Sequence, residues 1–275
     1  MAASTAALRG ITKQYKDFTL GPVDMTVPAG SIVGLIGENG AGKTTLLKIL
    51  CGVNRADDGT VDLLGGSPAD AATRAKIGVV FEDAFFYGSF TAAQVARSLA
   101  GMYGARWNAD SFSAYLRRFG LDAGKKLKEY SRGMRLKLSL AAALAHDPEL
   151  LVLDEATAGL DPVVRGELLD LFLEFIQDER HSIVMSSHIT ADLEQIADSI
   201  AYLHNGQLLF QENKDDLLQE YGVLHCGEDV LTSLPAGLVV FTRRGAYGCE
   251  SLVRERRTVQ ELLPEAVCDA ARLDD

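Results

Sequence analysis

The stretch Gly37-Glu38-Asn39-Gly40-Ala41-Gly42-Lys43-Thr44-Thr45 decides how this chain folds, because it fits the pattern G-x-x-x-x-G-K-[ST] without a mismatch. Residues 31–36 before it, SIVGLI, form a short apolar run that is typical of a buried strand. Residues 45–50 after it, TLLKIL, favour the first turns of a helix that ends near Gly52. The sequence therefore predicts a strand, a glycine-rich turn and a helix N-terminus in succession.

A turn of this kind is suited to phosphate, because its backbone N–H groups point inward and the helix end carries about +0.5 charge. Gly37, Gly40 and Gly42 let the backbone wrap closely around oxygen atoms. We expect Lys43 to reach the β- and γ-phosphates and the Thr44 hydroxyl to ligate Mg²⁺. The other residues assigned to this site are Glu38, Asn39, Ala41 and Thr45. The stretch thus predicts a nucleoside triphosphate site, with ATP and Mg²⁺ as its expected ligands.

Composition narrows the classes of partner. The 275 residues carry a formal net charge of −11 and 47% of them are hydrophobic, with a sequence pI of about 5.0. An acidic chain argues against nucleic acid as a partner, since nucleic-acid binding requires a basic face. The four cysteines show neither a C-x-x-C pair nor zinc spacing, so we expect reduced thiols in a cytoplasmic protein. We find neither a signal peptide nor an apolar run long enough to span a membrane.

The pattern of the chain predicts an α/β fold around a P-loop NTPase core. Residues 1 to about 30 are β-rich and predict an N-terminal antiparallel subdomain, followed after the P-loop by a tight-turn signal at Asp57-Asp58-Gly59-Thr60. Residues 84–146 show helical spacing, with Thr91 as an N-cap, and predict a helical insertion. Alternating strands and helices then indicate a mainly parallel sheet. Residues 222–275 are interpreted as a small C-terminal appendage, with a hairpin between Leu238 and Val253.

Two further strand ends carry side chains suited to phosphate chemistry. The apolar run 150–153 ends in Asp154 and Glu155, which places two carboxylates at the carboxyl end of a strand, beside the P-loop. We expect Asp154 to hold Mg²⁺ and Glu155 to orient or deprotonate the attacking water. Another predicted strand ends in Ser186-Ser187-His188, and His188 is expected to face the γ-phosphate and the water.

In this order, the motifs resemble the ATP-binding subunit of an ABC transporter. Gly37 to Thr45 resembles the Walker A motif, Leu150 to Glu155 the Walker B motif with its glutamate, and His188 the switch histidine. Tyr130-Ser131-Arg132-Gly133-Met134-Arg135 stands where the family has its signature, and Ala158-Gly159-Leu160-Asp161-Pro162 resembles the D-loop. Tyr15 lies where the family stacks an aromatic ring on adenine. The resemblance covers residues 8 to about 221, so we divide the chain into an ATPase domain, 1–221, and the appendage, 222–275.

The resemblance implies a mechanism and its partners. Two such domains, expected to be identical, close head to tail around two ATP molecules, so that Ser131 and Gly133 meet the γ-phosphate held by the other copy. Arg132 and Asp161 are also assigned to the nucleotide site. Closure acts on a separate transmembrane permease, which places the ATPase on the cytoplasmic face of the membrane. The motifs resemble the bacterial branch that exports drugs, antibiotics or polymers.

Two residues depart from the family pattern. Arg132 replaces a glycine of the signature, and either pairs with phosphate across the dimer interface or points to solvent. Glu82 replaces the glutamine that usually follows its strand, and an ionised carboxylate only accepts hydrogen bonds. Glu82 near phosphate must ligate Mg²⁺, be protonated or turn away. Our hypothesis is that it contributes to the metal site.

Three alternatives remain open. The aromatic run Phe85-Phe86-Tyr87 either receives a short helix of the permease or packs within the helical insertion. The chain is either a transport ATPase or a soluble ABC ATPase acting on ribosomes or DNA, although it has one P-loop, no heptad run and an acidic balance. A third interpretation of the function is a nucleotide-gated binding module with low turnover. Glu82 and Arg132 suggest this interpretation, whereas Glu155 and His188 oppose it.

Overall fold

The computed structural model describes residues 4–81, 86–231, 234–235, 237–245 and 248–273. Two units are distinguished by their internal contacts, Met1–Gln211 and Glu212–Asp275. Every motif of the predicted nucleotide site lies in the first unit. Glu82 and Phe85, for which the sequence suggested a metal ligand and an aromatic socket, lie outside the described residues.

A six-stranded sheet with the order β5-β6-β7-β3-β8-β9 forms the centre of the first unit. Its strands β5, β6, β7, β3 and β8 are joined by parallel pairings. The strands β3, β6 and β7 are buried along their whole length, as expected for parallel strands that are covered on both faces. The bounds are β3 Ile32–Ile36, β5 Ile77–Val80, β6 Leu150–Asp154, β7 Ser182–Ser186, β8 Ser199–His204 and β9 Gln207–Asn213.

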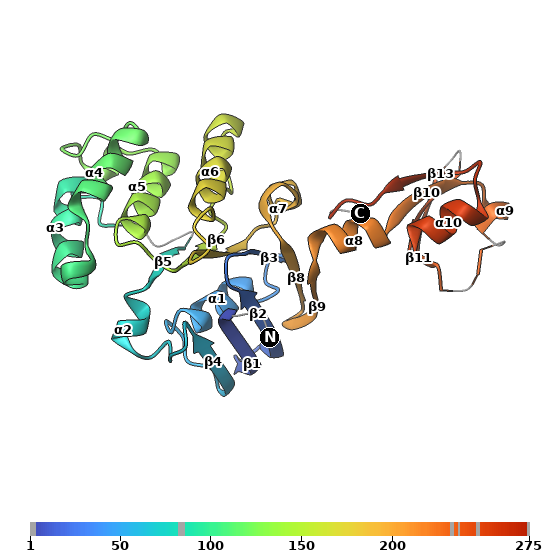
Figure 1. Ribbon diagram of the computed structural model, residues 1–275, viewed down its shortest axis with the longest axis horizontal. Helices are drawn as coiled ribbons and strands as arrows, with labels where there is room; N and C mark the ends of the chain where they lie inside the picture. Colours follow the sequence, from blue (N-terminus) through green and yellow to red (C-terminus); the bar gives the residue numbers. More distant parts are fainter. Residues whose placement is uncertain (1–3, 82–85, 232–233, 236, 246–247, 274–275) are drawn as a thin grey trace. The chain divides into compact units, whose positions relative to one another are not determined.

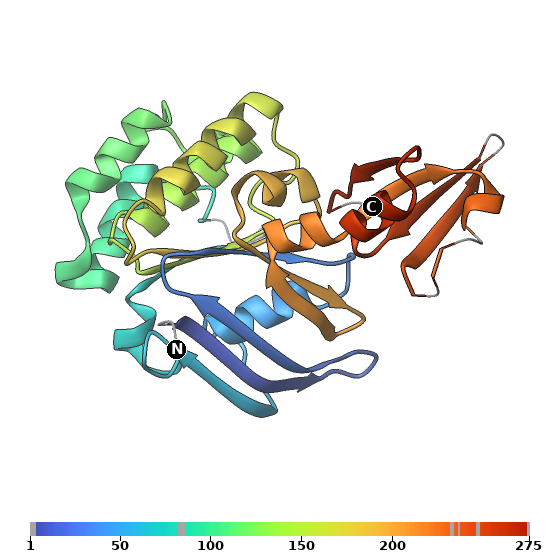
Figure 2. The same cartoon turned by 45° about the vertical axis from the view of Figure 1, so that its right-hand side comes forward.

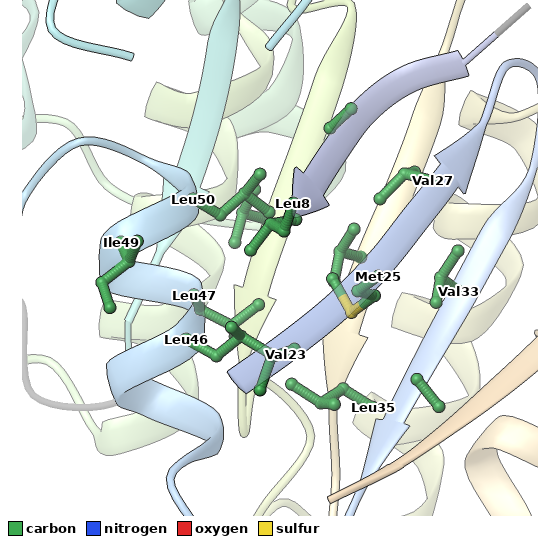
Figure 3. Packing of buried hydrophobic residues seen from close by; sticks show 14 of the residues in the cluster. Leu8, Val23, Met25, Val27, Val33, Leu35, Leu46, Leu47, Ile49 and Leu50 are labelled. Atoms are coloured by element: carbon green, nitrogen blue, oxygen red, sulfur yellow. The ribbon is translucent and has the colours of Figure 1, made fainter. Parts of the chain in front are cut away.

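A second, antiparallel sheet of three strands, in the order β2-β1-β4, lies on the other side of helix α1 (Figure 1). Leu46, Leu47 and Leu50 of α1 are fully buried, and Figure 3 shows them beside Leu8 of β1 and Val23 of β2. The helix therefore belongs to one core that joins the two sheets. The bounds are β1 Ser4–Gln14, β2 Thr19–Pro28, α1 Lys43–Leu50 and β4 Asp58–Leu63.

The turn expected at residues 57–60 is wrong in its placement, because β4 begins at Asp58. Gly59 has a φ of 89°, a turn-like value inside a strand, and a Cβ there would lie 2.5 Å from the carbonyl oxygen of Gly10. The pairing of β1 with β4 shifts register between Arg9 and Thr12, beside this glycine. Gly59 therefore marks a bulge where the sequence pattern indicated a turn.

The helical insertion is confirmed as a group of packed helices (Figure 2). Their buried side chains form an apolar cluster of their own. Thr91 is the N-cap of the insertion's first helix, as predicted, and it also forms a capping box with Gln94. Phe112 and Leu116 of the next helix are buried in the cluster, and Tyr115 and Phe119 pack against it. The bounds are α3 Ala92–Tyr103, η1 Gly104–Arg106, α4 Ala109–Arg118, η2 Leu127–Glu129 and α5 Arg132–Leu144.

Three more helices complete the first unit. Helix α6 begins at Pro162, whose fixed φ suits the first helical turn, and runs beside α5 (Figure 2). Helix α7 follows the end of β7, and α2 connects β4 to β5. The bounds are α2 Ala71–Arg74, α6 Pro162–Phe175 and α7 Thr190–Ile196. The predicted α/β fold, with a mainly parallel sheet and an antiparallel N-terminal subdomain, is therefore confirmed.

The second unit is a four-stranded sheet with the order β11-β12-β10-β13. The predicted hairpin is present as β11 and β12, which pair antiparallel. Leu224, Val253, Val259 and Cys268 form the centre of a small apolar cluster between the sheet and its helices. The bounds are α8 Lys214–Glu220, β10 Gly222–Cys226, α9 Glu228–Leu231, β11 Val239–Gly245, β12 Gly248–Val253, α10 Arg256–Leu262 and β13 Val267–Ala270.

In the part of the chain that the structure describes, no helix combines the length and the apolar character needed to cross a membrane.

Candidate nucleotide site

The predicted site residues meet at the carboxyl edge of the parallel sheet. The strands β6, β7 and β3 are neighbours, and their carboxyl ends lead into Glu155, His188 and the P-loop respectively. Ser186 pairs in register with Asp154 on one side and with Leu35 on the other. This topology brings the P-loop together with two motifs that lie more than a hundred residues after it in the sequence.

The P-loop backbone requires its glycines. Gly42 is the N-cap of α1 with a φ of 107°, and a Cβ there would lie 2.8 Å from the Phe18 ring. A Cβ on Gly37 would lie 2.2 Å from the carbonyl oxygen of Leu203. Glu38, Asn39 and Gly40 are exposed at the tip of the turn, whereas Ala41 is buried beneath it. The loop therefore offers an exposed cradle before a helix of eight residues, which suits the phosphates of a nucleotide.

Lys43 is held at the mouth of this cradle. Its Nζ donates hydrogen bonds to the carbonyl oxygens of Gly37, at 2.6 Å, and Glu38, at 3.3 Å. The same atom lies 3.5 Å from Oε1 of Glu155, and both side chains are largely buried. A single ammonium group thus joins the P-loop to the carboxylate that follows β6.

Glu155 connects Lys43 to His188. Its second oxygen, Oε2, lies 2.6 Å from Nδ1 of His188 and accepts the backbone N–H of His188 at 3.3 Å. Glu155 has a φ of 52°, in the left-handed region that side chains other than glycine seldom occupy. The structure thus brings together the two residues predicted for water activation, in an arrangement of base and orienting partner.

Thr44 and Asp154 form the oxygen donors expected for Mg²⁺. The Thr44 hydroxyl donates to Oδ2 of Asp154 at 2.8 Å, and the Ser186 hydroxyl donates to Oδ1 at 2.7 Å. Among the described residues, no group of three or more His, Cys, Asp or Glu side chains is gathered to hold a metal. One carboxylate and one hydroxyl nevertheless suit Mg²⁺, which usually takes its remaining ligands from phosphates and water.

The signature residues lie beside the D-loop. Ser131 is the N-cap of α5, where its hydroxyl accepts the N–H of Met134 at 3.2 Å. A Cβ on Gly159 would lie 3.2 Å from a guanidinium nitrogen of Arg132, and a Cβ on Gly133 would lie 3.5 Å from Leu160. Arg132 is exposed, and its guanidinium lies close to Gly159 of the D-loop.

Asp161 and Tyr15 occupy two other edges of the site. Asp161 is exposed and caps α6 by accepting the N–H of Val164 at 3.0 Å. Tyr15 is 42% exposed, and its ring centroid lies 6.5 Å from that of Phe18, the ring that contacts the Gly42 position. The β1–β2 loop thus presents an accessible aromatic face next to the P-loop.

Sequence reasoning missed Ser186 and Phe18 as parts of the site. The sequence pattern assigns Ser186 only to the strand before His188, whereas in the structure its hydroxyl donates to the carboxylate of Asp154. A polar residue at the end of an otherwise apolar strand is the signal that would have identified Ser186.

The pKa of the Cys51 thiol is raised to about 12, first by burial and then by the negative charge of Asp154. This thiol therefore stays protonated.

An apolar groove of about 320 Å³ lies between the sheet and the helical insertion. Val53, Phe81, Phe86, Leu99 and Tyr103 are among the residues that line it. Phe86 also packs against the cluster of the helical insertion, whereas Tyr87 is 77% exposed. The two described residues of the aromatic run thus differ, since one is packed and the other is accessible.

Comparison with known proteins identifies the family. The ABC transporter family model matches residues 20–158. An uncharacterised ABC transporter ATP-binding protein of Synechocystis is 38% identical over 206 residues, and the alignment covers 73% of this chain and 58% of that protein's length. The bacitracin transport ATP-binding protein of Enterococcus faecalis is 36% identical over 212 residues, covering 75% of this chain and 68% of its own.

A solved ATP-binding subunit of an ABC transporter has the same fold, with a TM-score of 0.71 and 28% sequence identity. The match covers 78% of this chain and 92% of that subunit. The motifs, their meeting at one sheet edge and these relatives agree with one another. The chain therefore belongs to the ABC transporter family, as a member with the family's ATP-binding ATPase domain.

Proposed function

We propose that this chain hydrolyses ATP as one of two identical subunits and thereby drives a separate permease, which exports a small molecule or peptide from the cytoplasm. The observation that carries the proposal is the position of Glu155, whose two carboxylate oxygens face Lys43 of the P-loop and His188. A carboxylate at this point is within reach of the water that attacks a γ-phosphate bound in the loop.

The proposed roles follow from the contacts. The residues proposed to bind ATP within one chain are Tyr15 and the P-loop residues Gly37, Glu38, Asn39, Gly40, Ala41, Gly42, Lys43, Thr44 and Thr45. Thr44 and Asp154 would hold Mg²⁺, whose charge would offset that of the phosphates. Glu82 keeps its proposed place in the metal site as a hypothesis only. Glu155 would accept the proton of the attacking water, and His188 would keep the Glu155 carboxylate oriented.

The second subunit is proposed because exposed polar groups lie together at the start of two long helices. Ser131 and Arg132 begin α5, and Asp161 caps α6, which runs beside it. The exposed N-terminus of α5 is suited to an anion, by the same dipole argument as the P-loop. Head-to-tail pairing would place this surface on the ATP that the other copy holds.

A permease helix is the proposed occupant of the apolar groove beside the helical insertion. Val53, which lines the groove, is 63% exposed. Tyr87 and Met102, which are 77% and 79% exposed, are next in sequence to the lining residues Phe86 and Tyr103. Exposed apolar side chains around a hollow are typical of a protein-binding site. The bacitracin transport ATP-binding protein supports transport as the process that the ATPase drives. Export as its direction is proposed from the resemblance of the motifs to the exporting branch. This partner would hold the ATPase on the cytoplasmic face of the membrane.

A mixing experiment tests the head-to-tail dimer. Lys43→Ala removes the P-loop ammonium and Ser131→Arg blocks the signature, so each variant alone is expected to be inactive. In a mixed dimer, one site combines the intact P-loop of one chain with the intact signature of the other. We therefore expect the mixture to regain ATPase activity, measured as phosphate release. A mixture as inactive as its components, although both variants fold and dimerise with ATP, would contradict this dimer.

The matched control for the mixing experiment is a second pair of variants that both damage the same site component, Lys43→Ala with Thr44→Ala. Every mixed dimer then contains two damaged P-loops, and we expect no recovery of ATPase activity. If all mixtures stay inactive while ATP still binds to the parent chain without turnover, the chain is instead a nucleotide-gated binding module.

Tyr15→Ala is expected to weaken ATP binding. Stacking of a base on an aromatic ring contributes about 1–3 kcal/mol, which corresponds to a roughly 5- to 150-fold rise in Kd. Tyr15→Phe keeps the ring and is expected to bind as the parent does. Calorimetric titration with ATP measures both, and equal affinities for the alanine and phenylalanine variants would exclude stacking on this ring.

A further inference from the structure

Ser186 is the last residue of β7 and lies at the point where the two Walker B carboxylates meet. Its side chain is fully buried, and β6 places Asp154 directly opposite it in register. The Ser186 hydroxyl donates to Oδ1 of Asp154 at 2.7 Å and accepts the backbone N–H of Glu155 at 3.1 Å. One hydroxyl thus contacts both residues proposed to handle the metal and the water.

The contact with Asp154 fixes how its carboxylate is turned. Oδ2 accepts the Thr44 hydroxyl, and Oδ1 accepts the Ser186 hydroxyl, so the two oxygens have separate partners. Asp154 is only 3% exposed, which leaves little water to replace a lost hydrogen bond. Without the Ser186 hydroxyl, the carboxylate would be free to rotate away from the direction in which Thr44 and a metal ion need it.

The contact with Glu155 supports an unusual backbone conformation. The Glu155 N–H donates to the Ser186 carbonyl oxygen and to the Ser186 hydroxyl, both at 3.1 Å. Because Glu155 has a left-handed φ of 52°, its backbone needs such contacts to remain in place. This conformation determines where the Glu155 side chain leaves the strand, and hence its placement between Lys43 and His188.

We infer that Ser186 is a positioning residue for ATP hydrolysis, which holds the Asp154 carboxylate and the Glu155 backbone through its single hydroxyl. The inference rests on the hydrolysis proposed above. Ser186 touches neither the water nor the phosphate in this role. It acts on the metal ligand and on the base together, so its loss affects both Mg²⁺-dependent binding and turnover.

The same strand offers a matched control at its opposite end. Ser182 is equally buried, and its hydroxyl also has several partners: it lies 2.7 Å from the Thr5 hydroxyl and 3.2 Å from the Gly30 nitrogen, whose N–H it accepts. These partners belong to β1 and to the turn after β2, outside the nucleotide site. Ser182→Ala therefore removes a buried hydroxyl from β7 without touching either carboxylate.

The experiment compares Ser186→Ala with Ser182→Ala in the full chain. Removing a group that orients a metal ligand typically costs about 10- to 100-fold in metal affinity or activity. We expect Ser186→Ala to lose kcat on this scale, and also to lose the gain in ATP affinity that Mg²⁺ confers, measured by calorimetric titration with and without Mg²⁺. Ser182→Ala is expected to keep the parental kcat and the parental gain in ATP affinity with Mg²⁺, even if its Tm falls as much as that of Ser186→Ala.

Two more variants separate the hydroxyl from packing. Threonine and valine have nearly the same shape as each other, but only threonine carries a hydroxyl. Ser186→Thr is therefore expected to have a higher kcat and a larger gain in ATP affinity with Mg²⁺ than Ser186→Val. Parental kcat and Mg²⁺ response in Ser186→Ala, or equal values for threonine and valine, would overturn the inference. If the parent binds ATP and Mg²⁺ but does not hydrolyse, the proposed function fails, while the Mg²⁺ titrations still decide the role of Ser186.

Discussion

Glu155→Gln is expected to lower kcat for ATP hydrolysis by about 10²–10⁴-fold, the usual loss when a general base is removed. Glutamine has the same shape, so its amide still reaches His188, but it has no carboxylate to accept a proton from water. It also removes the negative charge 3.5 Å from Lys43, which leaves the Lys43 ammonium more available to phosphate. We therefore expect ATP affinity to be kept or improved while turnover is lost.

Steady-state phosphate release and a binding titration measure the two effects of Glu155→Gln separately. The matched control is Glu149→Gln, which neutralises a carboxylate just before β6, at the opposite end of the same strand. Glu149 is paired with Lys76 at 3.3 Å at the surface, so its loss is expected to leave kcat unchanged. If the Glu155→Gln variant hydrolyses ATP as fast as the parent, Glu155 is not the general base.

Oligomeric state gives a second readout for the same variant. If two copies close around ATP, blocking hydrolysis holds them in the closed form, so Glu155→Gln with ATP and Mg²⁺ is expected to form a stable dimer. Light scattering at several protein concentrations detects it. The matched condition is ADP, which lacks the γ-phosphate and is expected to leave the chain monomeric.

The local parts of the site could be predicted from the sequence because they depend on short runs of residues. The P-loop lies between an apolar run and a helix, and Asp154 and His188 follow two other buried strands, so the sheet edge was foreseeable. The N-cap at Thr91 could be predicted for the same reason. Each of these signals lies within one short stretch of the chain, the scale on which hydrophobic periodicity is read.

The contacts between distant segments could not be predicted in this way. Ser186 is opposite Asp154 only because β6 and β7 pair in one register, which the single sequence does not specify. The closeness of the Arg132 guanidinium to Gly159 likewise depends on how the start of α5 lies against the D-loop, which the single sequence does not specify. At Gly59 the sequence predicted a turn and the structure has a bulge, because both features favour glycine.

A second large effect is expected from Arg165→Ala, which should lower the free energy of unfolding by about 3 kcal/mol or more. Nε of Arg165, on α6, donates to Oδ1 of Asp192, on α7, so the two side chains form an ion pair. Asp192 is 1% exposed, and its other oxygen, Oδ2, is buried without a hydrogen-bond partner in the described part of the chain. Removing the arginine would therefore leave a buried carboxylate without compensation for its lost hydration.

Urea unfolding measures this loss, and an exposed arginine provides its control. Arg118 on α4 pairs with Glu174 on α6 at 2.7 Å, but the two side chains are 42% and 63% exposed. Water replaces a lost partner at such a site, so Arg118→Ala is expected to cost less than about 1 kcal/mol. Equal losses for the two arginine variants would mean that the burial of Asp192 does not determine the effect.

The double variant separates charge from packing at this pair. Asp192→Asn removes the buried charge, so an accompanying Arg165→Ala no longer strands a carboxylate. If the charge is the cause, Arg165→Ala/Asp192→Asn is more stable than Arg165→Ala alone, and the two changes are not additive. Additive losses would instead assign the effect to the packing of the arginine side chain.

Arg165 lies four residues after Asp161 of the D-loop, and Asp192 lies four residues after the switch histidine His188. The same set of variants, measured by ATP turnover, therefore tests whether this ion pair keeps the D-loop and His188 in a fixed relation.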